Sequence, residues 1–139
     1  MKVLNDTETF HFYNANPKNH RTGDCVIRAI ATATGKSWDE VLIGLTETAL
    51  KCKQSPCDTA CYDKYLKSIG WVKHKQPRNL IDNTKFTGEE FCRIFAKDEP
   101  IIANIGGHHI VCIKDRKVWD IWDSTGGCIG NYWTKENEE

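Results

Sequence analysis

Apolar residues in the first half of the chain recur every three to four positions, the spacing of an amphipathic helix. The first such stripe starts after Asp24, runs through Val26, Ile27 and Ile30, and stops before Gly35. Asp is a common N-cap and Gly a common residue just past a helix, so this pattern predicts a helix between them. The same spacing predicts three further helices, over residues 37–50, 59–70 and 87–95.

Two of these helices carry a start signal. Ser37 is followed three residues later by Glu40, and Thr87 by Glu90. In this pattern, the capping box, the hydroxyl bonds a backbone amide of the first turn and the carboxylate bonds back to the N-cap amide. We therefore expect helices to begin directly after Ser37 and Thr87.

The second half of the chain has a different pattern. Short runs rich in Ile, Val and Trp replace the helical stripes, and Gly-Gly or polar residues separate them. Such runs are typical of strands, and the second and third should form a hairpin. We expect strands over residues 100–105, 108–113 and 117–123, with one more over 130–134. Helices followed by an antiparallel sheet indicate the α+β class.

Length and composition fit one globular domain. The chain has 139 residues, of which 40% are apolar, and that is enough for a core without covalent cross-links. We expect a single domain over residues 1–139 with a disordered acidic tail over 135–139. Nineteen basic residues balance nineteen acidic ones, so the net charge favours neither nucleic acid nor a membrane as partner.

One segment, Lys51–Arg78, is locally basic and contains Tyr62, Tyr65 and Trp71. Basic and aromatic residues together are typical of nucleic-acid surfaces. Most of these aromatic residues lie on the apolar face of a predicted helix, however, so we expect them in the core.

The chain shows no sign of export. The first residues have no apolar stretch of signal-peptide length, and no run approaches the roughly 20 residues of a membrane span. The seven cysteines are an odd number, which argues against the disulfide framework of a small secreted protein. We expect a cytoplasmic protein.

The candidate nucleophile is Cys25. It lies at the predicted N-terminus of the first helix, where the peptide dipoles favour a thiolate and lower the thiol pKa. An ordinary buried thiol is the competing interpretation. The negative charge of Asp24, which directly precedes Cys25, disfavours the thiolate unless its carboxylate turns onto the helix amides.

A nucleophilic thiol needs a base, and the base needs an acceptor that orients its ring. His108 and His109 begin a predicted strand, and their side chains point to opposite faces, so at most one of them can face a given site. On the next strand, Asp120 and Asp123 stand among apolar residues and need partners. A three-residue turn would set Asp123 opposite His109, and a two-residue turn would favour Asp120. We predict Asp123, with Asp120 as the alternative.

Cysteine, histidine and aspartate in this order resemble the papain-like cysteine peptidases. The chain length and the Gly-Asp-Cys run at residues 23–25 are similar to the compact bacteriocin-leader branch of that family. More narrowly, residues 12–17, 23–41 and 107–124 and the pair at 132–133 resemble small uncharacterised proteins of phages and prophages of Firmicutes. In those proteins the single histidine, counted back from residues 122–124, falls on His109.

The resemblance implies a papain-like fold in which N-terminal helices pack on a C-terminal antiparallel sheet. It implies a cysteine peptidase or related thiol acyl-transfer hydrolase that cleaves an amide or isopeptide bond with Cys25, His109 and Asp123. The substrate would be a host or phage protein or peptide, in the host cytoplasm if a phage encodes the chain, and no cofactor or metal is implied. The family's oxyanion side chain, usually Gln, would be replaced by Asn19, or by Asn16.

Three alternatives remain. The helix start at residues 24–30 also resembles that of OTU-type deubiquitinases. Cys52, Cys57 and Cys61 with His74 could bind zinc, but their spacing is not the usual one and we expect free thiols. The chain could also be a catalytically silent papain-like module of phage origin that binds a host protein.

Overall fold

The structure is a computed structural model, and it describes residues 6–136. Helices and one six-stranded sheet confirm the α+β class. The helices are α1 (Cys25–Thr34), α2 (Trp38–Cys52), α3 (Thr59–Ser68), α4 (Gly88–Glu90) and the π-helical turn η1 (Phe91–Phe95). The strands are β1 (Phe10–Phe12), β2 (Trp71–His74), β3 (Ile101–Ile105), β4 (His109–Lys114), β5 (Lys117–Asp120) and β6 (Ile129–Lys135).

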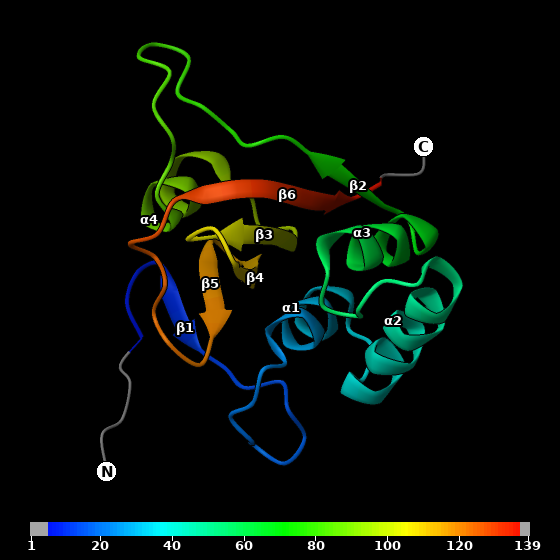
Figure 1. Cartoon of the computed structure of the whole chain (residues 1–139). Helices are drawn as coiled ribbons and strands as arrows, with labels where there is room; N and C mark the ends of the chain where they lie inside the picture. Colours follow the sequence, from blue (N-terminus) through cyan, green and yellow to red (C-terminus); the bar gives the residue numbers. More distant parts are fainter. Residues whose placement is uncertain (1–5, 137–139) are drawn as a thin grey trace.

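The sheet has the order β1-β5-β4-β3-β6-β2, and α1–α3 and α4 lie on opposite sides of it (Figure 1). The four strands expected in the second half are confirmed as β3 to β6. The edge strands β1 and β2 were not predicted. Because β1 pairs with β5 in parallel, the expectation of a purely antiparallel sheet, formed only by the C-terminal half, is wrong.

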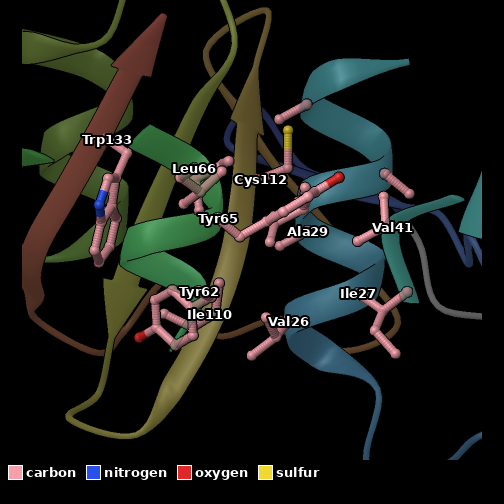
Figure 2. Close-up of a cluster of buried hydrophobic side chains, with 14 of the residues drawn as sticks. Val26, Ile27, Ala29, Val41, Tyr62, Tyr65, Leu66, Ile110, Cys112 and Trp133 are labelled. Atoms are coloured by element: carbon pink, nitrogen blue, oxygen red, sulfur yellow. The ribbon is translucent and has the colours of Figure 1, made fainter. Parts of the chain in front are cut away.

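Helices α1, α2 and α3 cover one face of the sheet. Their apolar stripes meet alternate residues of the central strands, such as Ile110 and Cys112 of β4. In Figure 2, Tyr62, Tyr65 and Leu66 of α3 approach these residues from one side and α1 from the other. The aromatic residues of the basic segment are thus core, as predicted.

The opposite face is covered by the segment that contains α4 and η1. Phe91 and Cys92 of η1 pack with Val111 and Ile113 of β4, the residues that alternate with the helix-facing ones. Both faces of β4 are therefore buried, which holds the strand that begins with His109 in a fixed position.

Both capping boxes are confirmed. The Ser37 hydroxyl accepts from the Glu40 amide, Thr87 accepts from the Glu90 amide, and each glutamate bonds back. The fourth helix has α-helical form for only three residues before it widens into η1.

The hairpin between β4 and β5 has a two-residue turn. Lys114 pairs with Lys117, and the central residues Asp115 and Arg116 have φ of 52° and 62°. Positive φ at both central positions is the type I′ geometry that suits the twist of paired strands. The three-residue turn, which would set Asp123 opposite His109, is therefore wrong. The pairing of β4 with β5 differs from that prediction by one residue.

Lys135 lies in β6 and pairs with Trp71, so the disordered tail predicted from residue 135 does not begin there. Residues 137–139 of that tail lie outside the described residues. Within residues 6–136, none of the helices combines the length and apolar character that crossing a bilayer requires.

Candidate active site

Cys25 is the first residue of α1, and its thiol lies beside the start of β4. Burial on its own would raise the pKa of this thiol. Hydrogen bonds to the His109 ring and the Ile110 amide, together with the positive charges of His109 and Arg28, outweigh burial and lower the pKa below its ordinary value. These contacts favour the thiolate over the thiol.

His109 joins Cys25 to a carboxylate. Its Nε2 lies 2.5 Å from Oδ2 of Asp120, which leaves Nδ1 as the ring nitrogen for the sulfur. Burial would lower the pKa of His109, but the bonds and charges of Asp120 and Cys25 raise it to about 9. The ring is therefore an imidazolium at neutral pH, and its charge favours ionisation of the neighbouring Cys25 thiol. His108 is exposed on the preceding turn.

The carboxylate that bonds the His109 ring belongs to Asp120, not to Asp123. With the two-residue turn, Asp120 falls diagonally across from His109, on the same face of the hairpin. Asp123 lies beyond the end of β5, where its Oδ1 accepts from the backbone amide and hydroxyl of Thr125 at 2.9 and 2.6 Å. Asp123 thus stabilises a turn. The structure pairs His109 with Asp120, the alternative residue, and not with the predicted Asp123.

Asp120 is held from a second side by Arg28. The Arg28 guanidinium donates to Oδ1 of Asp120 at 2.5 Å and to Oδ1 of Asp24 at 2.8 Å. The three side chains are almost fully buried. Burial would raise the pKa of Asp120, but its bonds to His109, Arg28 and the Ile121 amide lower it. Arg28 therefore links the helix that carries Cys25 to the strand that carries Asp120.

The Asp24 carboxylate does not cap α1. Its Oδ2 accepts instead from the Asn16 amide at 3.1 Å and from the Trp38 indole at 3.0 Å, and no side-chain bond to the helix start is formed. The amides of the first turn of α1 stay free of this carboxylate, and Arg28 offsets its charge near Cys25.

The two asparagines predicted to donate to the oxyanion, Asn19 and Asn16, have other surroundings in the structure. Asn19 is exposed, in a turn with φ of 57°. Asn16 is buried and its Nδ2 bonds Asp24. In the part of the chain that is described, neither side chain forms a hydrogen bond with Cys25. Cys25 is the first residue of α1, and the first amides of a helix have no acceptor within it, so its backbone amide can donate to another oxygen.

Trp122 covers the histidine. Its ring lies 4.8 Å from that of His109 and is tilted by 35°. Trp119, by contrast, packs against His11 and Tyr13. Trp122 is itself half exposed, so it shields the His109–Asp120 contact from one side and presents its other side to solvent.

Two residues of the site were not predicted from the sequence, Arg28 and Trp38. A signal for Arg28 was present, because it is the one charged residue in the ten-residue helix α1 and follows Asp24 by four positions. A buried face that includes a single arginine needs a carboxylate partner. Trp38 gave no signal, since a tryptophan at a helix start is more often simply packed.

Two of the four residues considered for zinc, Cys61 and His74, have other hydrogen-bond partners. Cys61 is buried and donates to the Leu45 carbonyl at 3.5 Å, and His74 Nε2 lies 2.7 Å from the Thr134 hydroxyl. Within residues 6–136, no group of three or more His, Cys, Asp or Glu side chains is placed to hold a metal ion.

The buried carboxylates predict an acid-sensitive fold. The pKa values of Asp24 and Asp120 are lowered despite burial, so their contribution to stability is complete above the unfolded value of about 3.9 and is lost as the pH falls through the folded values. We expect the urea unfolding free energy to fall below about pH 4. The fall should be shallower in Asp120→Asn, and equal slopes for the two proteins would contradict the assignment.

No family model, curated protein or solved structure among those compared with this chain matches it.

Proposed function

We propose that this chain is a thiol acyl-transfer hydrolase, of cysteine peptidase type, that cleaves an amide or isopeptide bond in a protein or peptide. One observation carries the proposal. Sulfur, imidazole and carboxylate of Cys25, His109 and Asp120 form a row at the start of a helix, with a lowered pKa for Cys25 and a pKa of about 9 for His109. An ordinary packed thiol needs none of these partners.

In this mechanism the Cys25 thiolate attacks the substrate carbonyl carbon and forms a tetrahedral intermediate. The negative charge on the oxygen is bound by the Cys25 amide at the start of α1, where the helix dipole adds to the stabilisation. The His109 imidazolium then gives its Nδ1 proton to the leaving nitrogen, and the carbon–nitrogen bond breaks. Water, deprotonated by the now neutral His109, attacks the thioester and releases the acid and the thiol.

Asp120 and Arg28 act through the histidine. Asp120 fixes the ring by accepting from Nε2, and Arg28 keeps Asp120 ionised by lowering its pKa. Arg28 is thus a positioning residue, since it touches neither the substrate nor the sulfur. The resemblance to papain-like cysteine peptidases supports the same chemistry. The resemblance to small proteins of phages and prophages favours the cytoplasm of a host cell as the location.

The pH dependence of Cys25 alkylation tests this proposal. We expect iodoacetamide to modify Cys25 at pH 6 at least tenfold faster than Cys128, because an ordinary thiol with a pKa near 8.5 is only about 0.3% ionised there. Peptide mass spectrometry of the trypsin-digested protein reports each cysteine separately.

Cys128 is a matched control because it is exposed and unpaired with any histidine in the described part of the chain. Parallel profiles for Cys25 and Cys128, both rising only toward pH 8.5, would falsify the proposal.

A silent binding module is a second candidate, favoured by the long segment between β2 and α4. This segment protrudes from the rest of the protein (Figure 1). Leu80 and Ile81, between the bridged residues Arg78 and Lys85, are completely exposed, and exposed adjacent aliphatic residues often contact a partner protein. A module that only binds has no use for an ionised Cys25, so the alkylation profile separates the two candidates.

A further inference from the structure

A cavity of about 300 Å³ opens between the start of α3 and the ends of β3 and β6. The side chains that line it with polar atoms are all neutral, and no charged residue lines it within residues 6–136. They are the hydroxyls and carboxamides of Thr59, Tyr62, Gln76, Asn104 and Asn131, and the indole of Trp133, whose Nε1 donates to Asp63 at 2.9 Å.

Two residues that line this cavity lie close to the segments that carry the proposed nucleophile and its base. Gly107, on its wall, precedes His109 by two residues. Tyr62, on the opposite wall, packs in one cluster with Val26 and Ile110, the chain neighbours of Cys25 and His109 (Figure 2). Burial and the nearby charge of Cys25 also raise the pKa of the Tyr62 hydroxyl, against the bond from Thr59 that lowers it.

The carboxamides are held in place by backbone groups. Asn104 Nδ2 donates to the Gly107 carbonyl at 3.2 Å, and Gln76 Nε2 donates to the Ile129 carbonyl at 2.9 Å. A Cβ at Gly130 would lie 2.8 Å from Oδ1 of Asn104, so the glycine leaves room for this oxygen. Asn104 retains its carbonyl oxygen and a second N–H for other partners, and Gln76 retains a second N–H, because its Oε1 accepts from Arg78 at 3.3 Å.

Such a lining discriminates between side chains by charge and polarity. A neutral polar group can donate and accept here without leaving a charge unpaired. A charged side chain would lose hydration without meeting a counter-charge, and an apolar one would leave the lining amides and hydroxyls without partners.

We propose that this cavity is a substrate subsite that takes a neutral polar side chain, above all a carboxamide, from the peptide that Cys25 attacks. This inference rests on the proposed function and adds the substrate class to it. Asn131, half-buried on the wall, is the residue through which the preference can be changed.

Peptidyl vinyl sulfones, which trap a reactive thiol covalently, test the subsite. A set in which one position at a time carries Gln, Asn, Leu or Lys is added at pH 6, and the rate of Cys25 modification is read by mass spectrometry. At one position we expect Gln and Asn to react about fivefold faster than Leu and Lys, the effect of about one net hydrogen bond.

The charge variant Asn131→Asp should shift this preference toward Lys by about fivefold, the effect of one partly exposed ion pair. Asn83→Asp is the matched control, because it makes the same change in an exposed turn outside the cavity. We expect it to leave the order of rates unchanged.

Two results would overturn the subsite alone. One is equal rates for all four side chains at every position while iodoacetamide still modifies Cys25 rapidly at pH 6. The other is a Gln preference that Asn131→Asp does not alter. Slow modification of Cys25 by every probe, iodoacetamide included, overturns the proposed function itself and the subsite with it.

Discussion

Replacing Arg28 with methionine is expected to lower the free energy of unfolding by about 3–5 kcal/mol, the cost of removing one partner from a buried ion pair. The guanidinium bridges Asp24 and Asp120, whose side chains are 3% and 2% exposed. Methionine retains much of the apolar packing but leaves Asp24 buried without a counter-charge, and it leaves Asp120 with His109 as its one remaining ion-pair partner within residues 6–136. Urea denaturation at pH 7, followed by tryptophan fluorescence, measures the loss.

Arg93→Met is the matched control for this prediction. The Arg93 side chain is 49% exposed and pairs with Glu8 and Glu89 on the surface. Surface pairs contribute little, so we expect a loss below about 1 kcal/mol. A triple variant that combines Arg28→Met with Asp24→Asn and Asp120→Asn should recover part of the loss, since it removes the unpaired charges. An Arg28→Met protein as stable as the parent would contradict the role given to this bridge.

The second large effect concerns Asp120→Asn. We expect the rate of Cys25 alkylation at pH 6 to fall at least about tenfold. The amide N–H₂ that faces Nε2 donates rather than accepts, so it stabilises the neutral ring with its proton on Nδ1, and that proton prevents Nδ1 from accepting the thiol proton. A thiol of ordinary pKa is then left, and its higher intrinsic nucleophilicity offsets part of the lost thiolate. His109→Gln removes the base altogether, so it gives the lowest rate expected for Cys25 alkylation at pH 6.

Asp123→Asn is the matched control, and we expect alkylation of Cys25 to be unchanged in it. Cys92 and Cys112 supply a check on folding within the same experiment. Both thiols are buried, which raises the pKa of each to about 12, so their modification reports unfolding. A fall in the Cys25 rate that Asp123→Asn also causes, or that is accompanied by labelling of Cys112, would count against the assignment.

The position of the acid shows where sequence reasoning stops. Strand periodicity placed Asp120 and Asp123 on the return strand, but only the turn length decides between them. The turn Asp115–Arg116 adopts positive φ without a glycine or an asparagine, the residues that usually signal a type I′ turn. Without that signal, a shift of one residue moved the predicted partner of His109 from one carboxylate to the other.

The helices were easier to predict, because capping residues and apolar spacing are local properties. Ser37 and Thr87 marked helix starts correctly. The strand β1 was missed because three residues carry too little periodicity, and its partner β5 lies more than a hundred positions away. The link from Arg28 to Asp120 spans 92 positions, and it depends on how α1 packs against the hairpin.

The pairing of β1 with β5 constrains the order in which the parts of the protein can fold. Phe10 aligns with Val118, and the amide of Tyr13 donates to the carbonyl of Asp120 at 2.9 Å. The backbone on either side of the orienting acid is thus fastened by a segment synthesised long before it. A nascent chain can form its helices as they emerge, but Asp120 cannot bond His109 until β5 has left the ribosome. Until then the Cys25 thiol lacks the His109–Asp120 pair.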